Sequence, residues 1–260
     1  MGLLERIPLF GAYFEAKYQL RILEHKYPDD EELNSQAKFW NNRKLKAVIL
    51  YSARPVFGGR ERVDWPVQYF INPNDPVIKF ELEMNKLMVK NPFNCDDDIV
   101  KIYKYVRTNP SLPYVYSQDV NQFYVNEVWM FPPEMRVLKQ GDCDDWAGLL
   151  CSYLIAAGVP SYRVRFTAGT TNDGQGHATV YVLMDDHKRW KHINSTAPFA
   201  NPLPDVLDLY PSSNDANDKL GIHDCWFSFN DKNSWAEFET SATAGKYKKS
   251  KWAKFYKILR

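Results

Sequence analysis

The spacing of apolar residues divides the chain into helical and strand-like regions. Residues 14–27 (FEAKYQLRILEHKY) carry apolar side chains every three or four positions, and this pattern resumes in residues 31–53 after a break at PDD. Such spacing is typical of an amphipathic helix, so we expect a helical hairpin in this part of the chain. Residues 96–109 (DDDIVKIYKYVRTN) predict a further helix, because acidic residues precede its apolar positions and acids favour a helix start.

Another helix is predicted within residues 139–160 (KQGDCDDWAGLLCSYLIAAGVP). Acidic residues open it, Gly158 is a natural helix end, and Pro160 lies just beyond. Three strand-like runs follow, with the sequences SYRVRFTAG, GHATVYVLM and RWKHINST. A helix followed by antiparallel strands indicates the α+β fold class.

We divide the chain into a helical N-terminal extension (1–90), a core (91–200) and a C-terminal extension (201–260). The last part ends in residues 246–260, which contain seven Lys or Arg and no acid, with aromatic residues at helical spacing. We expect a basic, aromatic final helix that covers the protein's own core with its apolar face. Binding to nucleic acid or to an acidic partner is the alternative for this segment.

The composition indicates a globular protein that does not cross a membrane. Apolar residues make up 45% of the chain and aromatic residues 15%, and no apolar run approaches the roughly 18 residues of a membrane span. A net charge of +1 argues against a nucleic-acid footprint over the whole surface. The N-terminus shows no signal-peptide pattern and the four cysteines are widely spaced. We therefore expect free thiols in the cytoplasm or another reducing compartment.

The candidate chemistry centres on Cys143, which stands at the start of the helix predicted within residues 139–160. The positive end of a helix dipole stabilises a thiolate at this position. Asp142, Asp144 and Asp145 would oppose a thiolate, so we expect their side chains to point away and to make hydrogen bonds at the helix start. A small buried hydrophobe is the alternative interpretation of the same cysteine.

His177 lies at the start of the second strand-like run and is predicted to meet Asn194 on the third. A hairpin through DDHK would put residue 184 opposite 189, and hence 179 opposite 194. His177 and Asn194 would then share one face as diagonal neighbours. If the cysteine helix packs against that face, Cys143, His177 and Asn194 form a thiol, imidazole and amide in line. In such a triad the thiolate attacks a carbonyl carbon, the imidazole transfers the proton, and the amide orients the ring.

The ordered motifs GDCDDWA, GHATVYV and INST resemble the transglutaminase-like superfamily of papain-like cysteine enzymes. Upstream, WMFPPEMRVLKQGDCDDWA resembles the Trp-x-x-Pro-x-Glu-x-x-x-Leu-x-x-Gly-Asp-Cys pattern of bacterial transglutaminase-like cysteine proteinases, and the resemblance extends from residue 96 to about 200. It implies a papain-like core in which the cysteine helix packs on an antiparallel sheet. The family's third catalytic residue is usually an Asp before Pro or Asn, whereas Asn194 precedes Ser195 here.

A thiolate that attacks a carbonyl also needs hydrogen-bond donors for the oxyanion that forms. The backbone N–H of Cys143 is one candidate, because it lies at a helix start. The second donor could be the Trp129 indole or another side chain of the aromatic loop before the helix, residues 110–134. We expect Asp142 and Trp146 to line the same site.

Hydrolysis of an amide in a protein or peptide, through a thioester acyl-enzyme, is our first expectation for the function. One alternative is transglutaminase-type transfer to an amine. Another is a non-enzymatic structural or assembly protein, such as a virion component, that binds partners through its N-terminal helices or residues 246–260. We expect no cofactor, no membrane and no nucleic acid. We also expect no metal, because His223 and Cys225 lack the spacing of zinc ligands.

Overall fold

The computed structural model describes residues 45–46, 48–51, 65–108, 115–123, 128–185, 190–193, 221–236 and 258–259. Its helices are α4 (Pro76–Met84), α5 (Asp96–Thr108), α6 (Asp119–Phe123), α7 (Pro132–Leu138) and α8 (Cys143–Ala156). Its strands are β1 (Leu45–Lys46), β2 (Val48–Tyr51), β3 (Trp65–Pro66), β4 (Val115–Tyr116), β5 (Gln140–Gly141), β6 (Val164–Thr171), β7 (Gly176–Leu183), β8 (Trp190–Ile193), β9 (Ile222–Phe229), β10 (Ser234–Ala236) and β11 (Ile258–Leu259). Residues 1–44, with most of the expected helical hairpin, and Asn194 lie outside the described residues.

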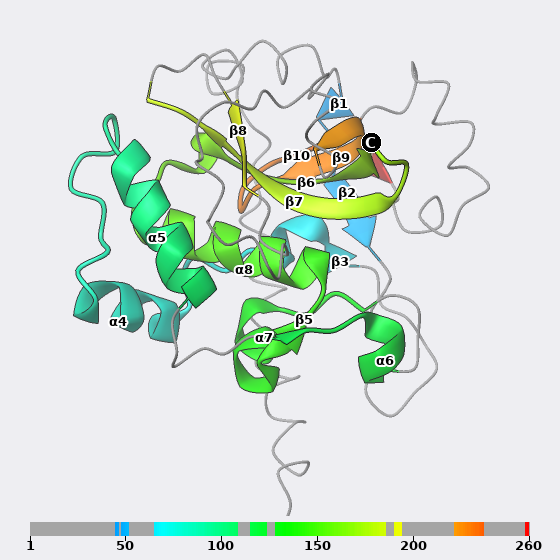
Figure 1. Ribbon diagram of the computed structural model, residues 1–260. Coiled ribbons are helices and arrows are strands. Elements are labelled where there is room, and N and C mark those ends of the chain that lie inside the picture. Colours follow the sequence, from blue (N-terminus) through cyan, green and yellow to red (C-terminus); the bar gives the residue numbers. More distant parts are fainter. Residues whose placement is uncertain are drawn as a thin grey trace, which may run out of the picture.

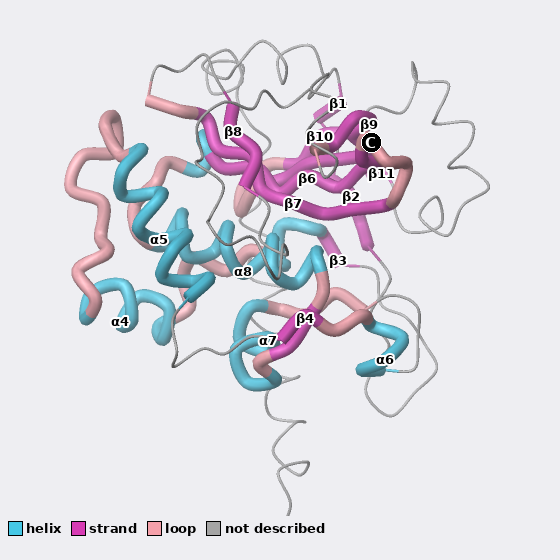
Figure 2. The backbone as a smooth tube through the Cα atoms, viewed as in Figure 1, coloured by secondary structure: helices cyan, strands magenta, loops and turns pink. Residues whose placement is uncertain are grey.

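Six strands form one antiparallel sheet in the order β1-β10-β9-β6-β7-β8. The sheet forms one layer, and α8 lies against it with α4 and α5 beyond (Figures 1 and 2). This arrangement confirms the predicted α+β class. β1 comes from the expected N-terminal extension and β9 and β10 from the C-terminal one, so all three parts of the chain contribute to the same sheet.

Two short segments form strands where the sequence predicts helix. In residues 45–51, β1 pairs with β10, and β2 pairs with β3 and β11. The expected helix over residues 31–53 is therefore wrong at this end, and the final helix of residues 246–260 is wrong at Ile258–Leu259, which form β11. In both places pairing with strands distant in sequence satisfies the backbone, and the run VILY fits a sheet through its β-branched residues.

α8 is buried along most of its length, which fixes its first residue relative to the sheet. Every residue from Asp144 to Leu154 is buried, so the helix is apolar on nearly all sides. At Gly148 it approaches the neighbouring backbone closely, since an added Cβ would lie 2.6 Å from the carbonyl oxygen of Phe70. Any larger residue there would push α8 away from its neighbours.

The pairing of β7 with β8 follows the register that the sequence predicts. Val180 lies opposite Ile193 and Leu183 opposite Trp190, which is the register that puts residue 184 opposite 189. The prediction is therefore confirmed for the described part of the hairpin.

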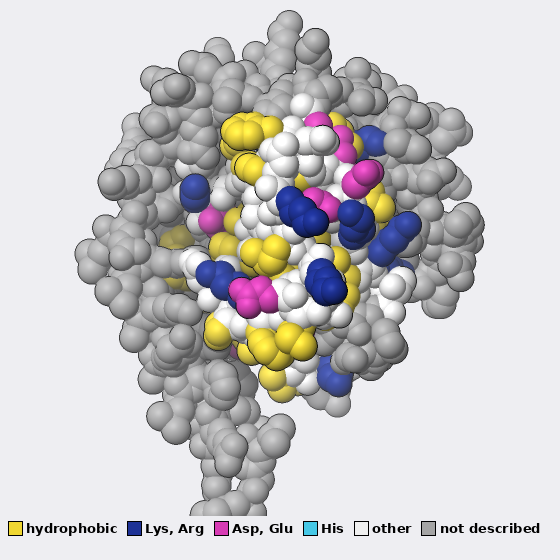
Figure 3. Space-filling view, turned by 90° about the vertical axis from the view of Figure 1, so that its left-hand side faces the viewer, with side chains coloured by type: hydrophobic (Ala, Val, Ile, Leu, Met, Phe, Trp, Pro, Cys, Tyr) yellow, Lys and Arg dark blue, Asp and Glu magenta, His cyan; other side chains and the backbone are white. Residues whose placement is uncertain are grey.

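Part of the outward surface of α4 is apolar. Val77, Phe80 and Met84 are 46%, 60% and 66% exposed, and they follow helical spacing along one side. Figure 3 faces this side of the molecule and shows apolar patches separated by Lys and Arg. None of the described helices is both long enough and apolar enough to cross a membrane.

Candidate active site

The start of α8 is built around Asp145, which accepts two backbone hydrogen bonds. Its carboxylate accepts from the N–H of Asp142 at 3.2 Å and from that of Met130 at 2.7 Å. Gly141 leaves room for this, because an added Cβ would lie 2.7 Å from Asp145 Oδ2. The expectation that the acids make hydrogen bonds at the helix start is thus confirmed for Asp145. The consequence is a rigid link between the helix start and the segment that contains Met130.

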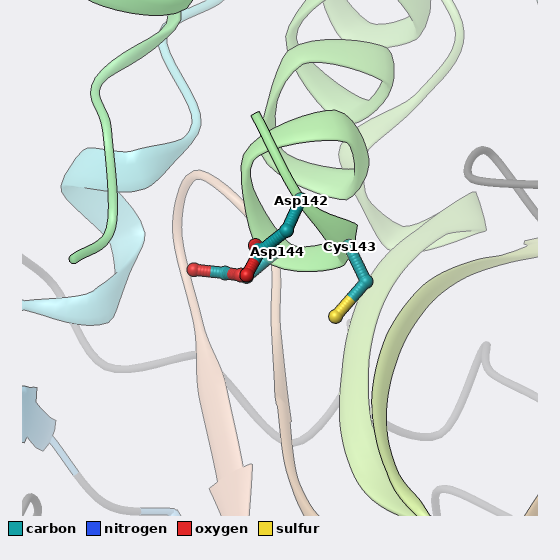
Figure 4. Close-up of side chains that lie close together, drawn as sticks. All are labelled: Asp142, Cys143 and Asp144. Carbon is teal, nitrogen blue, oxygen red and sulfur yellow. The ribbon is translucent and has the colours of Figure 1, made fainter. Parts of the chain in front are cut away.

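Cys143 is half-buried at the first position of α8. Figure 4 shows its Sγ on the side of the helix where the yellow-green strands run. Asp142 and Asp144 each keep a carboxylate oxygen within 4.8 Å of this sulfur, so the expectation that they point away is wrong. Their negative charges oppose thiolate formation, while the helix dipole favours it.

His177 is the second residue of β7 and is half-buried. The alternate positions of the strand, Ala178, Val180 and Val182, belong to the same apolar core as α8. The expectation that α8 packs against the His177 face is therefore wrong, because burial of this apolar row decides which face meets the helix. α8 and β7 begin at the same end of the sheet (Figure 1). If the His177 imidazole contacts Cys143, it does so at this end of the sheet, where both elements begin.

On the face of β7 that carries His177, Thr179 contacts a second histidine, His192 of β8, whereas Tyr181 and Leu183 further along belong to a second apolar cluster. The hydroxyl of Thr179 donates to the carbonyl oxygen of Ile193 at 3.0 Å and lies 2.8 Å from Nε2 of His192. Which of these two groups donates depends on the tautomer of the His192 ring. This contact was not predicted from the sequence, because it depends on the register of the hairpin.

The aromatic loop contributes Tyr116, which the sequence did not single out. β4 pairs in parallel with β5 and puts Tyr116 opposite Gly141, and the N–H of Ser117 donates to the Gly141 carbonyl at 3.0 Å. Partial burial, followed by the charges of Cys143 and Asp142, raises the pKa of Tyr116 to about 12. The phenol therefore keeps its proton at neutral pH.

The two tryptophans expected at the site are buried. Trp129 is 1% exposed, and its ring centroid lies 5.1 Å from those of Phe70 and of Phe166. Trp146 is 2% exposed, with the Arg107 guanidinium 5.8 Å from its ring. These positions give the proposed oxyanion role of Trp129 no support, because a ring enclosed in the core has little access to a bound substrate. Both rings support the site from within the core.

Three carboxylates form a cluster behind the helix start. Asp119, Asp142 and Asp145 each offer an oxygen within 4.8 Å of the others, and Asp119 also accepts a hydrogen bond from the N–H of Val128. Burial, followed by the charge of Asp142, raises the pKa of Asp145 well above its usual range. A proton or a cation would relieve this repulsion, and oxygen ligands of this kind suit Ca²⁺ or Mg²⁺. Sequence reasoning missed Asp119, which lies outside the GDCDDWA motif.

The family model that matches the chain is described as bacterial transglutaminase-like cysteine proteinase and covers residues 85–188. A search of curated proteins gives no match. Among solved structures, Legionella pneumophila LapG is similar at 18% identity over 71% of this chain and 94% of that chain, with a TM-score of 0.42. The calcium-bound form gives 20% identity over 60% and 75%, with a TM-score of 0.41. The EGTA-treated form gives 17% identity over 72% and 90%, also with a TM-score of 0.41.

The family match includes the helix that carries Cys143 and the strand that carries His177, and it ends before Asn194. It confirms the resemblance seen in the sequence motifs. Because the TM-scores are low, no residue role is taken from LapG. Residues 85–188 thus resemble the bacterial transglutaminase-like cysteine proteinases, and the rest of the chain lies outside that match.

Proposed function

We propose that this protein is a cysteine peptidase that cleaves an amide in a protein or peptide, with Cys143 as its nucleophile. The family match supports a cysteine-peptidase-like enzyme. The observation that carries the proposal is the position of Cys143, a half-buried thiol at the first residue of a buried helix inside the matched segment. Of the four free cysteines, Cys95, Cys151 and Cys225 are buried and Cys143 alone is not.

In the proposed reaction the Cys143 thiolate attacks the carbonyl carbon of the substrate and His177 acts as base and then as acid. His177 would take the thiol proton and return it to the leaving amine, so that a thioester remains on Cys143. Water would then hydrolyse the thioester and restore the thiol. Asn194, which lies outside the described residues, is proposed to orient the imidazole as the amide of the triad that the sequence motifs predict.

The test is the pH dependence of alkylation by iodoacetamide, with the modified residue identified by mass spectrometry. We expect Cys143 to react well below the pH of an ordinary thiol, whose pKa is about 8.5, and His177→Ala to abolish this reactivity. Cys151 is the internal control, since burial raises its pKa well above the usual range and it should stay unmodified in the folded protein.

A Cys143 that reacts like a free thiol regardless of His177 would contradict the proposal. The scaffold would then favour a structural or assembly protein. Transfer to an amine is distinguished from hydrolysis by adding a primary amine to the acyl-enzyme and measuring whether an amide product forms in place of the acid.

A further inference from the structure

Attack of a thiolate on a carbonyl moves the carbonyl π electrons onto oxygen, beside the sulfur. A site that stabilises this oxyanion usually holds at least two hydrogen-bond donors near its position. The backbone N–H of Cys143 is one candidate donor, because Cys143 is the first residue of α8. Trp129, the other donor expected from the sequence, is enclosed in the core.

Tyr116 has the placement that a second donor needs. The parallel β4–β5 pair puts it opposite Gly141, two residues before Cys143, and hydrogen bonds fix the pairing on both sides. The N–H of Val115 donates to Lys139 at 2.9 Å, and that of Ser117 donates to Gly141 at 3.0 Å. Backbone pairing with the segment that leads directly into α8 therefore holds Tyr116 beside the helix start.

Tyr116 is also accessible and stays protonated. Its side chain is 42% exposed, in contrast to the buried Trp129 and Trp146. Burial is the largest cause that raises its pKa to about 12, and the charge of Cys143 comes next, ahead of those of Asp142 and Asp144. Together with the register that puts Tyr116 opposite Gly141, this leaves a protonated O–H group on the segment that pairs beside the start of α8.

We propose that the Tyr116 hydroxyl is the second donor of the oxyanion hole, opposite the backbone N–H of Cys143. The inference rests on the proposed peptidase function and adds a catalytic residue to it. As the S–C bond forms, the carbonyl oxygen becomes negative and accepts a hydrogen bond from Tyr116, which keeps its proton. When the C–N bond breaks, the electron pair returns to the carbonyl, and the proton held by His177 goes to the leaving amine.

Two reactions of the same thiol separate this role from a purely structural one. Acylation by p-nitrophenyl acetate passes through a tetrahedral oxyanion, whereas alkylation by iodoacetamide displaces iodide and forms no oxyanion. For Tyr116→Phe we expect the acylation rate constant of Cys143 to fall by about 10²-fold, the size typical for loss of one oxyanion donor. The alkylation rate constant should stay at the wild-type value, which also shows that the variant is folded.

The matched control is Tyr105→Phe on α5. It removes a hydroxyl that accepts a hydrogen bond from the Asn85 side chain at 3.2 Å. This variant should acylate and alkylate like wild type. Equal loss of both reactions in Tyr116→Phe would overturn the proposal, because Tyr116 would then act on the thiol and not on the oxyanion. Unchanged acylation in Tyr116→Phe would overturn it as well. A wild-type Cys143 inert to both reagents would instead overturn the peptidase function, and Tyr116 with it.

Discussion

Two clusters of buried charge are built in opposite ways. In the first, Arg163 is fully buried and its guanidinium pairs with Asp96 at 3.0 Å and Asp185 at 2.7 Å. In the second, the carboxylates of Asp142 and Asp145 lie within reach of each other and of Asp119. Neither Asp142 nor Asp145 forms an ion pair with a basic residue among those that the structure describes. In the first cluster a positive charge lies between two negative ones, whereas the second brings together carboxylates alone.

The difference separates a structural cluster from one that belongs to the site. Arg163 also donates to the carbonyls of Leu183 and Pro92, at 2.8 and 3.0 Å, so it joins the start of α5 to the end of β7. The carboxylate cluster lies directly at the start of the helix that carries Cys143. Like charges kept together in a buried place cost stability, and such costs concentrate where a protein does its chemistry.

The largest effect is expected from Arg163→Met. The substitution leaves Asp96 and Asp185 partly buried without their cation, and loss of one partner of a buried pair costs about 3–5 kcal/mol. Urea unfolding followed by circular dichroism measures this change. The control is Lys101→Met, which breaks an exposed pair with Asp98 at 3.0 Å and should cost about 1 kcal/mol or less. Equal losses in the two variants would show that Arg163 is not the compensating charge.

The contrast between the clusters also shows what the sequence could predict. The helix at 143–156, the strands after it and the β7–β8 register follow from local spacing and turns, and the structure confirms them. The GDCDDWA motif located Cys143 at the helix start. These features need only residues that are neighbours along the chain.

Features that depend on distant segments could not be predicted. Tyr116 reaches the site through a pair of two-residue strands, too short to show any alternation. Asp119 joins Asp142 and Asp145 only through the tertiary fold. The face of β7 that meets α8 is the one whose side chains are apolar and buried, which is the Ala178 side and not the His177 side. Motif spacing alone does not reveal this difference.

A smaller effect is expected from Gly141→Ala, which crowds the carboxylate cluster. The new Cβ would lie 2.8 Å from Asp145 Cβ, and overpacking of this kind costs about 1–3 kcal/mol. We also expect slower acylation of Cys143, since the displaced carboxylate fixes the helix start. Gly174→Ala is the control, because Gly174 has φ +84° and no atom within 4 Å of an added Cβ. That variant should lose stability through backbone strain alone and keep the wild-type acylation rate.

The two clusters should also differ in how their contributions to stability change with pH. The pKa of Asp145 is raised by burial, followed by the charge of Asp142, so folding takes up a proton. Its contribution to stability is therefore complete below the unfolded pKa of about 3.9 and is lost as pH rises through the folded value. Asp185 behaves oppositely. Although burial opposes the shift, hydrogen bonds from the N–H groups of Cys95 and Asp96 and from Arg163 lower its pKa.

Asp145→Asn tests this sign, because the amide does not titrate. Relative to wild type, the melting temperature of the variant should increase as pH rises from about 5 to 8. The measurement needs EDTA, so that no cation compensates the carboxylates. Calcium chloride in place of EDTA should raise the wild-type melting temperature more than that of the variant. A difference independent of pH would mean that Asp145 carries no excess charge in the folded protein.

The smallest effect is expected from Asp173→Asn, which removes a fully exposed carboxylate beside His177. A hydrogen bond from the Thr171 hydroxyl is the largest cause that lowers the pKa of Asp173, and the charge of His177 contributes as well. By reciprocity, loss of this negative neighbour should lower the pKa of His177, and only slightly because the pair is exposed to solvent. Nuclear magnetic resonance titration of the imidazole at low and high salt measures the shift. It should shrink at high salt, where exposed charges are screened, whereas a shift that persists would place His177 and Asp173 in a buried contact like that of Arg163.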